Sequence, residues 1–203
     1  MSSKRDLEKK ILDKIVGGFV DFIVSRKVEP NFLTFLAFIF SLTSSLFFYI
    51  SRYFDIALCF ASMLLLISGF IDAIDGMVAR KSNRESTLGA FLDSTLDKIG
   101  ESSVFIGIIM SGRTSYFWTS LALATSILIS YVRARAEALG VDLRGVGFME
   151  RAERIILIVV GGFLEFVFKG LLDWVMIALA ILSLVTIVQR IIYVTSKLNR
   201  KLS

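Results

Sequence analysis

The chain has 203 residues and a formal net charge of +5, with 55% hydrophobic and 20% charged residues. Soluble domains average about 45–50% apolar residues, and here the excess lies in runs of roughly 20 residues, long enough to cross a bilayer core. The absence of histidine excludes imidazole catalysis, and the single cysteine, Cys59, excludes an internal disulfide and a cysteine zinc site. We therefore expect an all-α integral membrane protein whose chemistry comes from carboxylates, lysine, arginine, hydroxyls and the backbone.

The segment 3–20 mixes basic and acidic residues without a clean apolar stretch, so it lacks the pattern of a secretory signal. Its apolar residues recur at helical spacing on one face; they are Leu7, Ile11, Leu12, Ile15, Val16, Phe19 and Val20. A basic amphipathic helix of this kind is expected to lie flat at the membrane surface. We assign residues 1–30 to this N-terminal interfacial helix and a linker.

The hydrophobic runs predict six transmembrane helices, at 32–51, 54–80, 86–111, 115–140, 149–168 and 171–195. They form one six-helix bundle over 31–197, in a chain (1–203) that we treat as a single domain. The connections around Arg52, Arg113 and Lys169 hold one basic residue each, whereas the opposite side holds clusters of them. Because positive charge marks the cytoplasmic side, both termini are expected there, in the cell membrane. Charge tied to a membrane rim faces anionic headgroups and disfavours nucleic acid as a partner.

Two consecutive predicted spans carry aspartates, which cost about 2.5–3.5 kcal/mol each in a membrane helix and usually serve a function. Asp72 and Asp75 end the second span, and Asp93 and Asp97 lie early in the third. Spacings of three and four residues place each pair on one helix face, and the short connection makes the two spans antiparallel neighbours. The four carboxylates therefore converge on the cytoplasmic side, where hard divalent ions such as Mg²⁺ or Mn²⁺ suit an all-oxygen site.

Small and basic residues accompany these carboxylates. Gly76 and Gly89 remove side-chain bulk, which gives the phosphates or ribose of a ligand close access to the backbone. Gly89 also fits a helix-packing role, the commoner one in membranes. Arg80, one turn beyond Gly76, is either a natural partner for a diphosphate or an arginine that extends to the membrane interface.

The complete pattern resembles the signature of the CDP-alcohol phosphotransferase family at every fixed position, Asp72-x2-Asp75-Gly76-x2-Ala79-Arg80-x8-Gly89-x3-Asp93-x3-Asp97. The resemblance implies a homodimeric enzyme that transfers a substituted phosphate from a CDP-linked donor to an alcohol and releases CMP. It also implies that the four aspartates bind two metal ions and that Asp97 is the general base. Two metals suit this chemistry because they neutralise the diphosphate and the leaving phosphate.

The resemblance further assigns seven residues to the CDP donor, namely Asn31, Thr34, Gly76, Ala79, Arg80, Ser86 and Gly89. Ser86 also fits a helix N-cap, and Pro30 or Asn31 also fits the start of a helix. The lipid part of the donor, either diacylglycerol or archaeol, is expected to face apolar helices.

Two arginine-rich segments, 131–138 and 147–154, lie on the same predicted rim as the aspartates. We interpret their arginines as a site for the phosphate of an acceptor; they are Arg133, Arg135, Arg151 and Arg154. The alternative is pairing with the interleaved glutamates, which would hold helices together. Both segments resemble the branch of phosphatidylinositol-phosphate and archaetidylinositol-phosphate synthases, which implies transfer of a phosphatidyl-type group to inositol phosphate.

Other functions fit parts of the pattern. Glycerol 3-phosphate needs the same cations, so phosphatidylglycerophosphate synthase is the nearest alternative, followed by a synthase that condenses CDP-inositol with inositol phosphate. Intramembrane prenyltransferases also bind diphosphate through Mg²⁺ and aspartates, but generally in longer chains without these glycines and Arg80. A cation or proton transporter would place its carboxylates near the centre of the bilayer.

Overall fold

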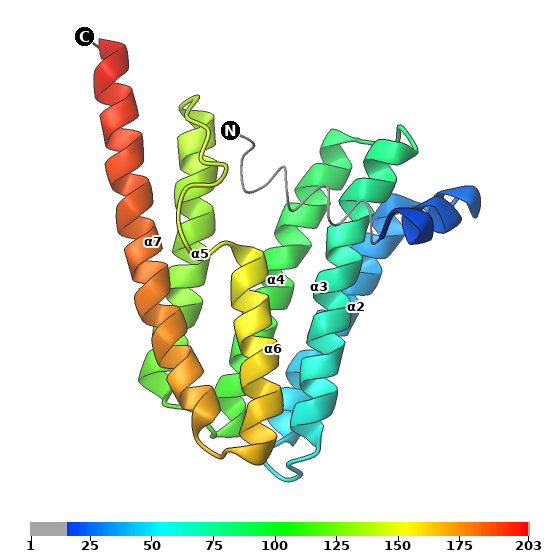
Figure 1. Cartoon of the computed structure of the whole chain (residues 1–203), viewed down its shortest axis with the longest axis vertical. Coiled ribbons are helices and arrows are strands. Elements are labelled where there is room, and N and C mark those ends of the chain that lie inside the picture. Colours follow the sequence, from blue (N-terminus) through cyan, green and yellow to red (C-terminus); the bar gives the residue numbers. More distant parts are fainter. Residues whose placement is uncertain (1–15, 203) are drawn as a thin grey trace.

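The computed structural model describes residues 16–202, and within this range its regular secondary structure is entirely helical. A short helix, Val16–Ser25, precedes six long ones: α2 (Pro30–Ile50), α3 (Ala57–Lys81), α4 (Thr87–Ser111), α5 (Tyr116–Ala138), α6 (Arg151–Val167) and α7 (Leu171–Leu202). Figure 1 shows the long helices running alternately up and down. We call the end that carries Val16–Ser25 and the C-terminal part of α7 the terminal end, and the opposite end the far end.

Four helices in the described range are long and apolar enough to cross a membrane: α2, α3, α5 and the Leu171–Asn199 part of α7. They are the helices of a membrane protein. α4 carries two of the four aspartates of the predicted site in its first half, and α6 has only 17 residues and begins at the charged Arg151. Both helices lie where spans were predicted, but their crossing of the membrane stays a prediction.

Local sequence explains where several helices begin and end. Pro30 lies in the first turn of α2, where its missing N–H has no intrahelical partner to lose. The Ser86 hydroxyl caps α4 by accepting a 3.0 Å hydrogen bond from the Gly89 N–H. Gly112 ends α4 with a left-handed φ of 69°, which glycine adopts without strain. The helix-start interpretations of Pro30 and Ser86 are therefore confirmed.

The helix Val16–Ser25 lies across the terminal ends of α2 and α3, at a steep angle to both (Figure 1). Its buried face packs against them in a cluster of Val16, Val20, Ile23, Leu33, Ile74 and Val78. Phe19 and Phe22 project from its other side and are 51% and 54% exposed. The other predicted members of the amphipathic stripe, Leu7, Ile11, Leu12 and Ile15, lie outside the described residues, and the interfacial location of the segment stays a prediction.

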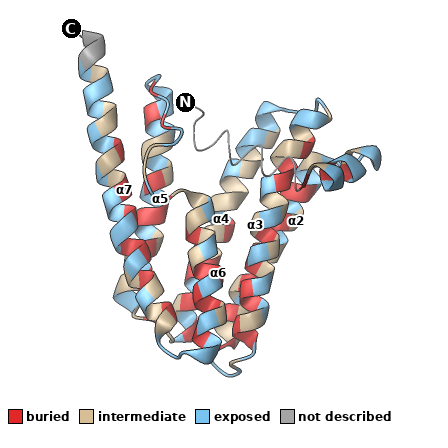
Figure 2. Cartoon of the chain, viewed as in Figure 1, coloured by how far each residue is buried: buried red, intermediate tan, exposed pale blue. Residues whose placement is uncertain are grey.

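The apolar core occupies the inner faces of the long helices, and Figure 2 shows many of its buried residues toward the far end. Phe48, Phe105 and Met176, from α2, α4 and α7, are fully buried there. α2 packs against α3 and α4, while α6 packs against both α3 and α7. α2 and α4 approach closely at Gly107, where a Cβ atom would overlap the carbonyl oxygen of Ser45.

Ion pairs tie the far-end connections together. Arg113, between α4 and α5, forms an ion pair with Asp55, and its Nε donates a 3.1 Å hydrogen bond to the Ser51 carbonyl oxygen. Lys169, between α6 and α7, contacts the same Asp55 carboxylate at 3.0 Å. Hydrogen bonds from Arg113 and Lys169 hold the pKa of Asp55 below its ordinary value. Three separate connections are therefore joined through one carboxylate.

Candidate active site

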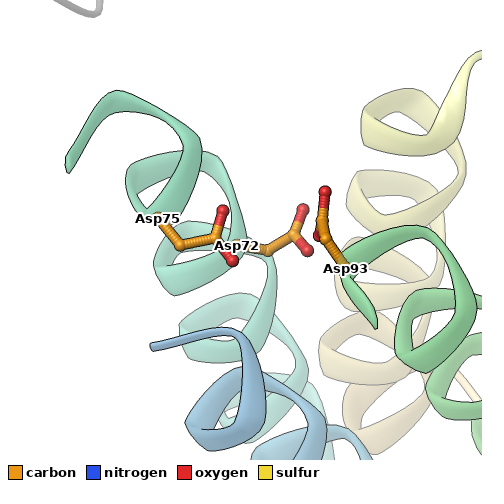
Figure 3. A group of neighbouring side chains, drawn as sticks. All are labelled: Asp72, Asp75 and Asp93. Atoms are coloured by element: carbon orange, nitrogen blue, oxygen red, sulfur yellow. The ribbon is translucent and has the colours of Figure 1, made fainter. Parts of the chain in front are cut away.

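Three carboxylates meet between α3 and α4 near the terminal end. Oxygen atoms of Asp72, Asp75 and Asp93 lie within 4.8 Å of one another, and Figure 3 shows the two α3 side chains extending toward Asp93 on α4. Asp75 is buried and accepts a 2.7 Å hydrogen bond from the Thr34 hydroxyl on α2. These three aspartates therefore converge as predicted, and the fourth, Asp97, lies within hydrogen-bonding distance of Asp72.

This donor set fits a hard divalent cation. Carboxylate oxygens that share one ion at 2.0–2.6 Å lie within about 5 Å of one another, as the oxygens of these aspartates do. Asp72 Oδ1 is buried and has no hydrogen-bond partner among the described residues. A buried acceptor in that condition is costly unless a ligand binds it. The chemistry and spacing of the site thus match those of a Mg²⁺ or Mn²⁺ site.

The fourth aspartate, Asp97, is joined to this group through an arginine. Arg151, the first residue of α6, forms an ion pair with Asp72 through Nη1, and its Nη2 lies 2.7 Å from Asp97 Oδ1. All three side chains are largely buried, with at most 23% of their surface exposed. The guanidinium therefore bridges carboxylates of α3 and α4 from a third helix.

A cavity of about 210 Å³ lies on one side of the carboxylates, at the terminal ends of α2, α3 and α4. Its lining includes all seven residues assigned to the CDP donor, Asn31, Thr34, Gly76, Ala79, Arg80, Ser86 and Gly89, together with Asp75 and Asp93. A Cβ atom at Gly89 would lie 3.0 Å from both Asn31 Oδ1 and Ser86 Oγ. Gly89 lines this cavity and also lies close to α2 through Asn31, so its position fits both the predicted access for a ligand and the helix-packing role.

A larger cavity, of about 840 Å³, opens on the other side of the carboxylates. Helices α3 to α7 all contribute to its lining, which includes the predicted site residues Asp72, Asp93, Asp97, Arg133, Arg151 and Arg154. Arg135 is exposed and does not line this cavity. Three of the four predicted acceptor arginines therefore share one cavity with the aspartates, and Asp93 lines both cavities.

Arg154 makes the contacts expected of an arginine that holds helices together. Its side chain is 1% exposed, and Nε donates a 2.7 Å hydrogen bond to Glu101 on α4. Nη1 donates a second hydrogen bond, at 3.2 Å, to the Met149 carbonyl oxygen. Arg133 is also paired, with Glu137 at 2.9 Å, but that pair lies within α5 and its arginine side chain is 43% exposed. The pairing interpretation thus describes Arg154 better than Arg133.

Arg190 on α7 was missed by the sequence analysis. It is buried, lines the larger cavity, and donates hydrogen bonds to the carbonyl oxygens of Val146 at 3.0 Å and Ile129 at 2.9 Å. The available signal was an arginine inside the last apolar run, because charged residues in membrane helices are rare and usually functional or paired. Arg190 fixes the connection between α5 and α6 against α7 and adds a cation to the cavity wall.

The fold and the site define a helical membrane enzyme with an aspartate-rich centre beside a cavity lined by several arginines. The family model of CDP-alcohol phosphatidyltransferase matches residues 27–192. The chain belongs to this family and is a transferase of phospholipid biosynthesis, as the signature around the four aspartates indicated.

Relatives are similar over most of their length. The chain is 37% identical to the archaetidylinositol phosphate synthase of Methanothermobacter thermautotrophicus, over 96% of this chain and 99% of that protein. It is 31% identical to the phosphatidylinositol phosphate synthase of Streptomyces avermitilis, over 89% of this chain and 78% of that protein.

Solved structures share the fold. The crystal structure of Mycobacterium tuberculosis phosphatidylinositol phosphate synthase with CDP-DAG bound has a TM-score of 0.75 and 30% identity, covering 89% of this chain and 94% of that chain. The same mycobacterial enzyme in complex with manganese and citrate also has a TM-score of 0.75 and 30% identity, covering 87% of each chain.

Proposed function

We propose that this enzyme transfers a phosphatidyl-type group, diacylglycerol phosphate or archaeol phosphate, from a CDP-lipid to inositol phosphate and releases CMP. The observation that carries the proposal is that Asp93 lines both cavities, so the two cavities meet at the carboxylates. Transfer between two bound substrates needs such a meeting point, because the reacting atoms must come within about 3–3.5 Å of each other. The names of the relatives in M. thermautotrophicus and S. avermitilis support inositol phosphate as the acceptor.

The smaller cavity is assigned to the CDP part of the donor. Arg80 and Arg84 supply positive charge beside it, which suits a diphosphate. Gly76 and Gly89 leave the backbone accessible on the same wall. The CDP-DAG bound to the mycobacterial structure supports a CDP-lipid as the donor.

Two divalent ions, Mg²⁺ or Mn²⁺, are assigned to Asp72, Asp75, Asp93 and Asp97. When bound, such ions neutralise the charge of the diphosphate and of the departing phosphate. The assignment is supported by the three convergent carboxylates and by the manganese in the mycobacterial structure.

Asp97 is assigned as the general base. Its carboxylate lines the larger cavity, on the side where the acceptor is placed. There it accepts the proton of the attacking acceptor hydroxyl. The hydroxyl oxygen forms a bond to the phosphorus that carries the lipid, and the bond between that phosphorus and the phosphate oxygen of CMP breaks.

The acceptor phosphate is assigned to Arg133 and Arg151, and we add Arg190, which shares their cavity. The burial of Arg154 against Glu101 and the outward position of Arg135 favour other roles for those two residues. The same cations suit glycerol 3-phosphate, so a phosphatidylglycerophosphate synthase is the competing assignment.

Both termini and the site are assigned to the cytoplasmic side, since most basic clusters lie in segments of the terminal end. The homodimer stays a prediction.

Release of CMP tests the proposal. Protein purified in detergent receives Mg²⁺, a CDP-lipid and one acceptor at a time: inositol phosphate, glycerol 3-phosphate, serine or free inositol. We expect release with inositol phosphate alone. The Asp93→Asn variant should lose this activity, whereas Asp142→Asn, the same change in the exposed connection between α5 and α6, should retain it. Release with glycerol 3-phosphate instead would move the enzyme to the competing assignment.

A further inference from the structure

Arg151 occupies an unusual position for a residue assigned to the acceptor, because it lines the larger cavity while its guanidinium contacts two of the site's carboxylates. Nη1 pairs with Asp72, and Nη2 lies 2.7 Å from Asp97 Oδ1. Planar guanidinium groups pair well with two acceptors at once. The pair of acceptors here comes from two different helices, so Arg151 holds α3 and α4 at a fixed separation beside the predicted metal site.

The contacts of Arg151 distinguish two overlapping sets among the four aspartates, because Asp97 also lies within hydrogen-bonding distance of Asp72. Asp72, Asp75 and Asp93 form the group whose oxygens lie within 4.8 Å, and Asp72 Oδ1 has no hydrogen-bond partner among the described residues. A first cation has ligands available there while Arg151 stays in place. A second cation that used Asp97 together with Asp72 Oδ2 would need the two oxygens that Arg151 contacts.

We propose that Arg151 and a second divalent cation are alternative occupants of the position between Asp72 and Asp97, and that the acceptor phosphate draws Arg151 away. This inference rests on the proposed function. Arg151 is exchangeable because its side chain lines the 840 Å³ cavity as well as contacting the carboxylates. Arg133, on α5, lines the same cavity, so an anion that binds there has cations from two helices available to it.

Exchange of this kind couples two binding events. If the acceptor phosphate favours the displaced position of Arg151, it favours entry of the second cation to the same extent, and the cation favours the phosphate reciprocally. Asp97 is then freed from its ion pair only when both are present. Arg151 thereby links loading of the second cation to the presence of acceptor, in addition to contacting the acceptor itself.

Binding of Mn²⁺, followed by the electron paramagnetic resonance signal of the free ion, tests the exchange without turnover. The whole protein in detergent is titrated alone, with inositol phosphate, with glycerol 3-phosphate and with inorganic phosphate. We expect one tight and one weak Mn²⁺ in the protein alone, and a weak site that tightens about tenfold with inositol phosphate. In Arg151→Gln the second Mn²⁺ should bind about tenfold more tightly without acceptor, and the acceptor should change that affinity less than twofold.

Two further variants keep the result interpretable. Arg144→Gln removes an exposed arginine paired with Asp142 in the connection between α5 and α6, and it should titrate like the wild type. Arg151→Lys keeps the charge and the fold but lacks the planar fork, so it should show a reduced effect of acceptor. Equal Mn²⁺ affinities in wild type and both Arg151 variants, with no effect of any phosphate, would overturn the exchange.

The same titrations separate this inference from the proposed function. Coupling with glycerol 3-phosphate but not with inositol phosphate would support the exchange and contradict the proposed acceptor. Release of CMP with inositol phosphate, together with Mn²⁺ binding that is independent of Arg151, would support the acceptor and contradict the exchange.

Discussion

Thr34 on α2 donates a 2.7 Å hydrogen bond to Asp75 on α3, so a side chain of the donor cavity orients one carboxylate of the proposed metal site. Hydrogen bonds to charged groups contribute about 1.5–3 kcal/mol. Thr34→Val removes the hydroxyl at nearly constant volume. We expect Mn²⁺ binding at the three-carboxylate site to weaken by about ten- to a hundredfold, measured by titration of the purified protein.

A threonine of the same helix provides the control for this change. Thr43 is half-buried, and its hydroxyl donates a solvent-exposed 2.8 Å hydrogen bond to the Ile39 carbonyl oxygen within α2. Thr43→Val should therefore leave Mn²⁺ binding unchanged. If Thr34→Val and Thr43→Val bind Mn²⁺ equally well, the hydrogen bond to Asp75 does not support a metal site.

Asp97→Asn is expected to lower turnover by at least about a hundredfold, the lower range for loss of a general base, while binding of the CDP-lipid stays close to that of the wild type. Asp97 lines the larger cavity and is absent from the donor cavity, so the amide should disturb the acceptor side more than the donor cavity. The two measurements are CMP release under saturating substrates and the dissociation constant of the CDP-lipid. Undiminished turnover in the variant would contradict the assignment of Asp97 as the base.

Arg154→Ala is expected to act on stability. It removes the buried arginine partner of Glu101, whose carboxylate keeps a 2.6 Å contact with Lys98. The cost is therefore expected to lie below about 3–5 kcal/mol, the cost of leaving a buried charge unpaired. Arg133→Ala breaks a more exposed pair within one helix and should change the unfolding temperature little. Thermal unfolding in detergent compares the two. An Arg154→Ala protein of wild-type stability with a raised KM for inositol phosphate would instead place Arg154 in the acceptor site.

Asp55 predicts a pH dependence of stability at the far end. Arg113 and Lys169 hold the pKa of Asp55 in the folded protein below 3.8. The ion pairs of Asp55 therefore stabilise the protein at pH values above the pKa of Asp55 in the unfolded chain. This stabilisation is lost as the pH falls through the lower pKa of Asp55 in the folded protein. Asp55→Asn should therefore unfold at a lower temperature than the wild type at neutral pH, and the difference should shrink as the pH falls below about 4. A difference that stays constant down to about pH 3 would show that titration of Asp55 contributes nothing.

Local patterns in the sequence predict those parts of the site that depend on spacing along one helix. Asp72 and Asp75 share a face of α3 because they are three residues apart, and Ser86 caps α4 because its hydroxyl reaches the Gly89 N–H. The charge pattern also places Arg113 and Lys169 in short connections at one end. Each of these predictions needs only helical periodicity and the chemistry of helix ends.

Helical periodicity and the chemistry of helix ends do not predict contacts between helices that are distant in the sequence. The pairing of Arg154 with Glu101 depends on the rotation of α6 against α4, which no local spacing fixes. The position of Arg151 between Asp72 and Asp97 depends on three helices at once. Arg190 could have been predicted as a site residue from its position as a single charge inside an apolar run. The clustered arginines of 131–154 were the stronger signal.

The central claim is that a lipid-linked phosphate moves from the nucleotide to inositol phosphate at the four aspartates. Its most direct test is the transfer of radiolabel from inositol phosphate into the lipid extract, with purified protein, CDP-lipid and Mg²⁺. We predict labelled lipid in an amount equal to the CMP released, lost on chelation and restored by Mg²⁺ or Mn²⁺. Release of CMP without label in the lipid, or label that persists after complete chelation, would contradict the account.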